Sequence, residues 1–191
     1  MLASSSPRRR ELLGILGIPF TVQHADIDES VRPGESPKAY AARLAREKAN
    51  TVARAHPGTL VLGADTTVIL RDEILGKPMD AADADRMLRA LSGKAHEVAT
   101  AVCLVKDGHA QEHVETTHVF MRAIPEHEIE AYIASGEPMD KAGAYAIQGG
   151  AAKWIYRIEG DYFNVVGLPL AAVWNLLKIK TQRQDAETQS S

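Results

Sequence analysis

The most informative part of the chain is the run TLVLGADTTVIL at residues 59–70, which the charged triplet RDE follows at residues 71–73. Val, Leu, Ile and Thr dominate this run and favour extended structure, so it predicts a buried strand that the triplet turns back. Helices are predicted on both sides of it. Residues 39–55 are rich in helix formers and end at Pro57-Gly58, and Asp80 can cap a helix that runs to Leu91. This alternation is typical of an α/β protein.

Further strands follow in the second half of the chain. Ala95–Lys106 and Ala110–Arg122 flank Asp107-Gly108, a pair that tolerates positive φ and marks a hairpin, so the sheet is predicted to be mixed. The other predicted elements are a short strand at Met1–Ala3, helices at Arg8–Leu16 and Pro125–Ser135, a Gly-rich stretch at Gly136–Gly150, a strand at Trp154–Ile158 and a helix at Leu168–Lys178. We expect one domain over residues 1–180, and the polar residues 181–191 to form a disordered tail.

Composition excludes several classes of protein. Of the 191 residues, 45% are hydrophobic and 25% are charged, which is the balance of a globular chain. The formal net charge of -3 argues against a general nucleic-acid binder, which needs a basic excess. No apolar stretch approaches the roughly 20 residues of a membrane span, and residues 1–10 lack the apolar centre of a signal peptide. The single cysteine, Cys103, lies in an apolar run, so we expect a buried, unpaired thiol and a cytoplasmic protein.

The first polar cluster is SSSPRRR at residues 4–10, between a strand end and a helix start. Backbone N–H groups, hydroxyls and guanidinium groups there could converge on one anion, and a helix N-terminus favours negative charge. A triphosphate would fit such a site. Serine before a helix is often only a cap, however, and arginines often form only a solvated face, so this cluster alone favours a structural role. It also lacks the GxxxxGK[ST] spacing of a P-loop.

The second cluster surrounds Asp65, at the end of the strand Leu60-Val61-Leu62. A carboxylate in this place lies where α/β proteins bind ligands, and it could hold a metal ion, orient a water molecule or only cap a turn. Lys77 stands in a stiff loop between Gly76 and Pro78, where its ammonium could meet a phosphate. Lys48 lies on the helix at residues 39–55, and by itself it would be assigned to the surface.

The third cluster is the Gly-rich stretch at residues 136–150. Its glycines allow close backbone approach, and Asp140, Lys141, Tyr145 and Gln148 supply polar groups that a plain connector would not require. Tyr145 is also large enough to need packing. The stretch therefore favours a binding loop over a flexible connector.

Taken together, ordered blocks of the chain resemble the Maf family at its spacing. The blocks are Ser4-Ser5-Ser6-Pro7-Arg8-Arg9, Ala45-Arg46-Glu47-Lys48-Ala49, Leu62-Gly63-Ala64-Asp65-Thr66, Gly76-Lys77-Pro78, Leu91-Ser92-Gly93, Gly136-Glu137-Pro138, Asp140-Lys141-Ala142-Gly143-Ala144-Tyr145, Ile147-Gln148-Gly149 and Val165-Val166-Gly167-Leu168-Pro169. The resemblance spans residues 2 to about 178. Any one block would carry little weight, but so many in order are far beyond chance.

The resemblance implies the fold that the family shares with ITP pyrophosphatases, a twisted mixed central sheet with flanking helices and two lobes around a nucleotide cleft. It also implies a homodimer, and cleavage of a nucleoside triphosphate between its α- and β-phosphates. Residues 140–149 are similar to the dTTP/UTP branch of the family and differ from the branch that acts on 7-methyl-GTP.

Individual roles follow from the same resemblance. Asp65 falls on the family's general base, and Arg9, Thr66 and Gln148 fall on its specificity positions. Its other polar pocket positions are occupied by Ser4, Arg8, Glu29, Lys48 and Lys77. Glu29 is a candidate ligand for a divalent cation, Mg²⁺ or Mn²⁺, since oxygen ligands suit either ion. Whether Asp65 accepts a proton from water or holds the metal stays open.

Two departures from the family pattern stand out. The chain starts close before its first motif, so the first strand is short and the Ser4–Arg9 loop could be loose. Thr67 replaces an aliphatic residue.

We therefore predict a pyrophosphatase that converts dTTP and UTP, and modified pyrimidine nucleotides with them, to the monophosphate and pyrophosphate. Its partner is then a small nucleotide, with no stable nucleic-acid or membrane partner. The alternatives are a 7-methyl-GTP pyrophosphatase and a noncatalytic, nucleotide-binding regulator of septum formation. A nucleic-acid-binding module ranks third, because no aromatic residues alternate with the basic cluster.

Overall fold

The computed structural model describes residues 1–178 and contains one six-stranded sheet in the order β1-β2-β4-β5-β6, with β3 paired to β2. The strands are β1 (Leu2–Ala3), β2 (Val61–Leu70), β3 (Glu73–Leu75), β4 (Ala95–Lys106), β5 (His109–Met121) and β6 (Ile155–Glu159). β1 runs parallel to β2, and the other paired strands are antiparallel. The predicted mixed sheet of an α/β protein is thus confirmed.

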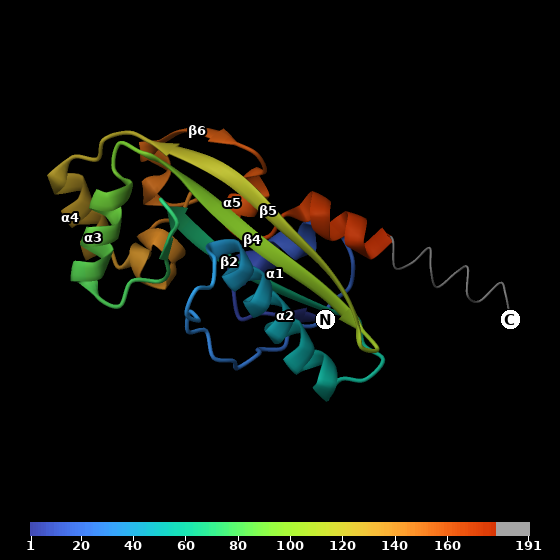
Figure 1. The fold of residues 1–191 in the computed structure, drawn as a ribbon. Helices are drawn as coiled ribbons and strands as arrows, with labels where there is room; N and C mark the ends of the chain where they lie inside the picture. The colour runs from blue at the N-terminus through green and yellow to red at the C-terminus, as the bar shows by residue number, and fades with distance from the viewer. Residues whose placement is uncertain (179–191) are drawn as a thin grey trace, which may run out of the picture.

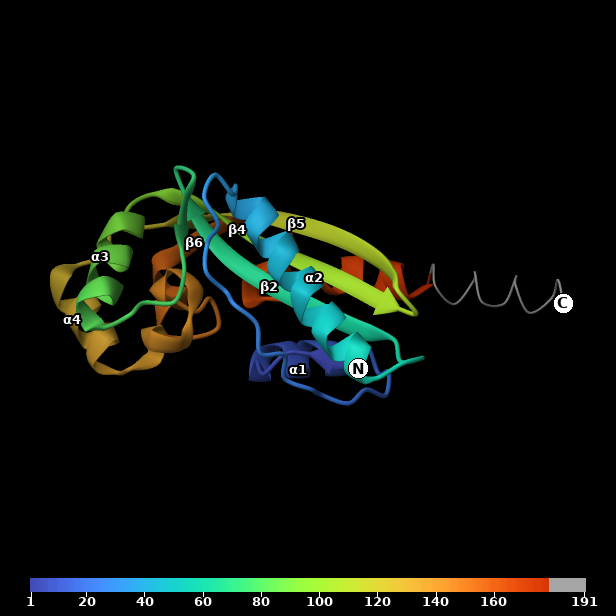
Figure 2. The same cartoon turned by 60° about the horizontal axis from the view of Figure 1, so that its bottom comes forward.

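Helices cover this sheet on both faces and at one end. They are α1 (Pro7–Ile15), α2 (Pro37–Ala55), α3 (Ala81–Leu91), α4 (Glu126–Ala134) and α5 (Tyr162–Val166), followed by helical residues 170–178. Figure 1 shows α3 and α4 together at one end of the long strands β2, β4 and β5. Figure 2 shows α2 lying along one face of β2 and β4. This arrangement brings α2 against the strand that carries Asp65.

Most predicted elements occur within a few residues of their predicted bounds. The predicted hairpin is β4–β5, and the side chain of Asp80 caps α3 by accepting from the Asp83 N–H at 2.8 Å. α1 begins at Pro7, because Ser6 accepts the Arg9 N–H and proline suits the first helical turn. The expected tail, residues 181–191, lies outside the described residues.

The Gly-rich stretch is more ordered than its composition suggests. It contains two short 3₁₀ helices, η1 (Glu137–Asp140) and η2 (Ala142–Ala144), and a third, η3 (Gly150–Trp154), begins at its last residue. η2 contains Gly143 at φ 68° and Ala144 at φ 58°, a left-handed pair that no helix pattern in the sequence reveals. Helix α5 was also not predicted, because its five residues are too few to show helical periodicity.

The buried core lies on both faces of the sheet and beneath α3 and α4. Three apolar clusters make it up: one with α3 and α4, one with α1 and the C-terminal helical residues, and one under α2. Cys103 belongs to the cluster under α2 and, as predicted, is buried with a free thiol. The division of residues 1–180 into two lobes stays a prediction. Within residues 1–178, no helix has both the length and the apolar character needed to cross a membrane.

Candidate active site

A cavity of about 510 Å³ opens between the sheet, α1, α2 and the Gly-rich loop. Every site residue predicted from the sequence lines it, namely Ser4, Arg8, Arg9, Glu29, Lys48, Asp65, Thr66, Lys77 and Gln148. These residues come from elements far apart in the chain, so the fold gathers them at one place. The volume is in the range of small-molecule binding sites.

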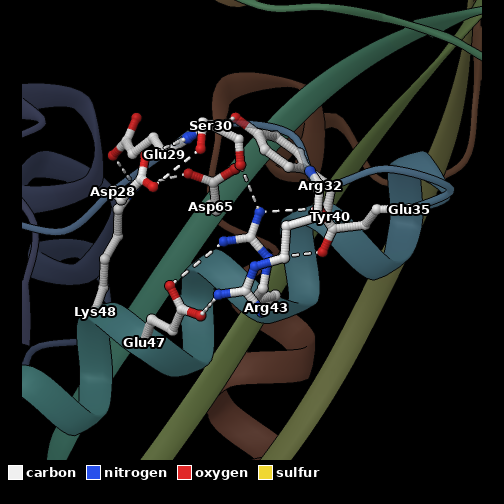
Figure 3. Close-up of polar contacts among 10 residues, drawn as sticks. All are labelled: Asp28, Glu29, Ser30, Arg32, Glu35, Tyr40, Arg43, Glu47, Lys48 and Asp65. Atoms are coloured by element: carbon white, nitrogen blue, oxygen red, sulfur yellow. Dashed lines mark hydrogen bonds and ion pairs between the residues drawn. The ribbon is translucent and has the colours of Figure 1, made fainter.

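Asp65 and Lys48 form a buried pair at the wall of this cavity. The Lys48 Nζ donates to Asp65 Oδ1 at 2.7 Å, and each side chain is 11% exposed. The same ammonium lies 2.7 Å from Glu29 Oε1 (Figure 3). Lys48 therefore contacts both carboxylates. Asp65 Oδ1 and Glu29 Oε1 each lie 2.7 Å from the Lys48 Nζ, so these two oxygens are at most twice 2.7 Å apart.

Close packing of α2 on β2 makes this pair possible. A Cβ at Gly63 would lie 2.2 Å from the Ala45 carbonyl oxygen and 2.7 Å from the Ala49 nitrogen, so only glycine fits there without a shift. Lys48 lies between Ala45 and Ala49 on α2, and Asp65 lies two residues after Gly63 on the same face of β2. Asp65 thus lies in the interior of β2 (Val61–Leu70) and not at the end of a strand, as its sequence context had suggested. The assignment of Lys48 to the surface, which its helix alone would suggest, is wrong because Lys48 is 9% exposed.

The two carboxylates have pKa values shifted in opposite directions. Burial raises the pKa of Asp65 above its ordinary value, although the charges of Lys48 and Arg9 oppose this shift. Partial burial acts to raise the pKa of Glu29 as well, but its hydrogen bond to Lys48 and the lysine charge outweigh burial and lower it. Asp65 is thus the carboxylate better suited to take up a proton, and Glu29 the one that stays ionised.

Beside the Asp65–Lys48 pair, Arg9 of α1 forms hydrogen bonds to β2 and to the residue that follows α5. Its Nε donates to the Gly167 carbonyl, its Nη1 to the Ala64 carbonyl and its Nη2 to Thr66 Oγ1, each at 2.9 Å. Since β1 ends at Ala3, the Ala64 carbonyl lies just beyond the last pair of the β1–β2 ladder, and the arginine satisfies it. The short first strand is therefore followed by a loop that Arg9 braces.

The Gly-rich loop carries Gln148 and is held by Glu137. Glu137 Oε1 accepts from the Tyr132 hydroxyl at 2.9 Å and from the Gly150 N–H at 3.0 Å. A Cβ at Gly149 would lie 1.7 Å from the same oxygen, so glycine leaves room for the carboxylate. Gln148 itself is exposed at the cavity, where its amide is free to meet a ligand.

Three residues in or behind the site were not predicted from the sequence: Tyr40, His96 and Asn164. Tyr40 lines the cavity from α2, and His96 pairs through Nε2 with the Tyr145 hydroxyl at 2.7 Å behind the Gly-rich loop. Buried Asn164 fastens α5 to the sheet by accepting the Thr100 N–H and donating to the Val98 carbonyl. Such contacts join segments that are distant in the sequence, and no local sequence pattern predicts them.

The donor set fits a hard divalent cation bound together with substrate. Within residues 1–178, no group of three or more His, Cys, Asp or Glu side chains could hold a metal ion alone. Two neighbouring carboxylates, Asp65 and Glu29, do face the cavity. Mg²⁺ is commonly bound by one or two carboxylates, with substrate phosphates and water completing its shell.

An α/β sheet with the buried Asp65–Lys48 pair at a cavity of small-molecule size is the arrangement of an enzyme that acts on a small molecule. Comparison with known proteins gives the family. Residues 1–179 match the family model described as Maf-like protein, so the chain belongs to the Maf family. It is 52% identical over 178 residues to the dTTP/UTP pyrophosphatase of Koribacter versatilis, covering 93% of this chain and 92% of the relative. It is 54% identical over 178 residues to the dTTP/UTP pyrophosphatase of Myxococcus xanthus, covering 93% and 90%. The family expected from the sequence is confirmed.

Proposed function

We propose that this protein hydrolyses dTTP and UTP to the nucleoside monophosphate and pyrophosphate. The observation that carries the proposal is the buried Asp65–Lys48 pair in a cavity that also gathers Arg8, Arg9 and Lys77. A carboxylate with a raised pKa beside a group of cations is suited to deliver water to a polyphosphate. The names of the relatives support the same reaction.

In the proposed reaction, a water oxygen attacks the α-phosphorus while Asp65 accepts the proton. The bond between the α-phosphorus and the oxygen that bridges to the β-phosphate breaks, and pyrophosphate leaves with the electron pair. Arg8 and Lys77 stabilise the charge that grows on the leaving group, because cations placed where charge develops lower the barrier. Lys48 holds the Asp65 carboxylate in place at 2.7 Å.

The cofactor in this proposal is Mg²⁺ or Mn²⁺, which Glu29 would hold together with the phosphates, while Asp65 stays available as the base. When bound, such an ion neutralises phosphate charge and lowers the pKa of a coordinated water. Glu29 suits this role because Lys48 helps to keep its carboxylate ionised.

Cytoplasmic residence and a homodimer also belong to this proposal. The free, buried Cys103 is compatible with a reducing compartment. Sedimentation equilibrium of the purified protein measures the oligomeric state.

The substrate choice rests on Gln148, and a nucleotide panel tests it. A side-chain amide offers an acceptor and two donors that match the N3–H and O4 edge shared by uracil and thymine. We expect wild-type kcat/KM to favour dTTP and UTP over CTP, GTP and 7-methyl-GTP. A polar base edge that is left without its hydrogen-bond partner lowers kcat/KM strongly. Gln148→Ala should therefore reduce kcat/KM for dTTP and UTP by at least about 10-fold, and reduce the ratio of these values to those for CTP and GTP.

The same panel separates the alternatives. A uniform loss in Gln148→Ala would make Gln148 a loop brace rather than a reader of the base. A wild-type preference for 7-methyl-GTP would assign the other branch of the family. Binding of dTTP without pyrophosphate release in either Mg²⁺ or Mn²⁺ would favour the noncatalytic regulator.

A further inference from the structure

Glu29 lies on a connector that has no regular secondary structure of its own. Residues 23–32, between α1 and α2, are assigned to neither helix nor strand, and the Glu29 side chain is 48% exposed. The Lys48 contact fixes the tip of the side chain but leaves the backbone to be held by other means. A carboxylate on a loose backbone would lose binding free energy, because its ordering would accompany each binding event.

Two residues of α2 hold the connector at this position. The Tyr40 hydroxyl donates to the Glu29 carbonyl oxygen at 2.9 Å, and Arg43 Nη2 donates to the Ser30 carbonyl oxygen at 2.9 Å. Figure 3 shows both side chains pointing from α2 toward the connector. Two consecutive carbonyl groups are therefore anchored, one of them belonging to Glu29 itself.

Arg43 is itself held in a fixed orientation. Its Nε and Nη2 donate to the two oxygens of Glu35 at 2.6 and 2.8 Å, and the two side chains are 11% and 10% exposed. Its guanidinium carbon lies 5.5 Å from the centre of the Tyr40 ring. The hydrogen bond from Arg43 lowers the pKa of Glu35 to about 2, so this pair is ionised at neutral pH. A two-point Arg–carboxylate pair of this kind has defined geometry, unlike most single surface ion pairs.

We infer that Tyr40 and Arg43 are positioning residues that hold the backbone of Glu29 so that its carboxylate faces Asp65 across Lys48, and that they thereby set the affinity of the site for its divalent cation. The inference rests on the proposed function in one respect, the role of Glu29 as a metal ligand. Tyr40 and Arg43 bind main-chain carbonyls of the connector and not the Glu29 carboxylate itself. Their effect passes through Glu29, which is what distinguishes this role from general stabilisation of α2.

The test measures Mn²⁺ binding by isothermal titration calorimetry, with the protein saturated by a dTTP analogue that carries a nonhydrolysable α,β-imido bridge. Tyr40→Phe removes the hydroxyl and keeps the ring against Arg43. We expect it to raise the Kd for Mn²⁺ about 3- to 10-fold, the loss that one hydrogen bond represents. Arg43→Lys keeps the charge but not the two-point pair with Glu35, and it should shift the Kd in the same direction.

A double-mutant cycle shows whether the effect passes through Glu29. In a Glu29→Gln background, Tyr40→Phe should change the Kd for Mn²⁺ less than 2-fold, because the ligand that Tyr40 positions is gone. An undiminished effect in that background, or an unchanged Kd in Tyr40→Phe alone, would overturn the inference. Melting temperatures of all variants are measured in parallel. A rise in the Kd for Mn²⁺ that is proportional to a fall in melting temperature across the variants would also overturn the inference.

Matched controls lie outside the site. Tyr156→Phe alters an exposed tyrosine on β6, and Arg89→Lys alters an arginine on α3 that pairs with Asp85 and Glu126. Both should bind Mn²⁺ as the wild type does. Because the titration needs no turnover, this inference and the proposed reaction can fail separately. A protein without pyrophosphate release that still shows the expected cycle would refute the reaction alone.

Discussion

Asp65 shows how burial alters one carboxylate and the stability of the fold together. Its folded-state pKa is raised above the ordinary value of 3.8, so the folded protein binds more protons than the unfolded chain between these two values. The free energy of unfolding therefore falls as pH rises through that interval, and the ionised Asp65 costs stability at neutral pH. A functional residue that weakens the fold is expected where chemistry needs a poised base.

Asp65→Asn should therefore separate activity from stability. At pH 7.5 we expect a melting temperature at or above that of the wild type, while kcat for dTTP falls by roughly 100-fold or more because the proton acceptor is lost. Wild-type kcat should decline as pH falls through the raised pKa of Asp65. Calorimetry and steady-state kinetics measure the two effects. Near-normal kcat together with a large drop in melting temperature would show a structural residue instead.

The sequence predicted which side chains lie together in the cavity, but not the contacts that hold them in place. Motif order placed Asp65, Lys48 and Lys77 in one pocket, and the structure brings them to one cavity. The anchors Tyr40 and Arg43 were missed because they bind main-chain carbonyls of an irregular connector, and such contacts leave no side-chain pattern. Their partners depend on the backbone path, which no propensity specifies.

At the scale of elements, the packing of α2 on β2 is the feature that builds the site. Gly63→Ala places a methyl group 2.2 Å from the Ala45 carbonyl oxygen, and neither backbone can yield without moving the helix. We expect the free energy of unfolding to fall by about 2–3 kcal/mol, as in other overpacked cores. Displacing α2 would also separate Lys48 from Asp65 and reduce kcat/KM.

Gly14→Ala is the matched control for this prediction. Gly14 lies in α1, and within residues 1–178 a Cβ added there meets nothing within 4 Å apart from its chain neighbours and the backbone of its own helix. Alanine is also the better helix former. Chemical denaturation should show unchanged or slightly higher stability for Gly14→Ala. If Gly63→Ala were equally well tolerated, the close approach of α2 would not be a constraint on the site.

The long elements were predictable because local preference and tertiary position agree in them. The strand β2, the hairpin β4–β5 and the helix α2 all follow clear apolar or helix-forming runs. The Gly-rich loop was predicted to bind a ligand, but its 3₁₀ turns depend on the contact of Glu137 with Tyr132 of α4 and on that of Tyr145 with His96 of β4. The His96 contact exists only once the sheet has formed.

At the scale of the whole molecule, His96 couples the sheet to the Gly-rich loop and makes stability depend on pH. Burial lowers the pKa of His96 to about 4 from its ordinary 6.5, and its buried Nδ1 has no hydrogen-bond partner within residues 1–178. The unfolded chain therefore binds more protons between these values, so this contribution to stability is complete above pH 6.5 and is lost as pH falls toward 4.

Urea unfolding at two pH values measures this effect. Moving from pH 7.5 to pH 5.0 should remove about 2 kcal/mol through His96 alone. His96→Gln keeps a polar partner for the Tyr145 hydroxyl but does not titrate, so its loss over the same interval should be smaller by that amount. Equal losses in the two proteins would mean that His96 is as free to ionise in the fold as in the unfolded chain.

In the proposed reaction, water attacks the α-phosphorus and Asp65 is its base. The most direct test is hydrolysis of dTTP in water enriched in ¹⁸O, with the products of the wild type and of Asp65→Asn separated and analysed by mass spectrometry. We predict that the wild type places one ¹⁸O atom in dTMP and none in pyrophosphate, and that Asp65→Asn forms both products at least about 100-fold more slowly. Label in the pyrophosphate, or undiminished turnover by Asp65→Asn, would contradict the account.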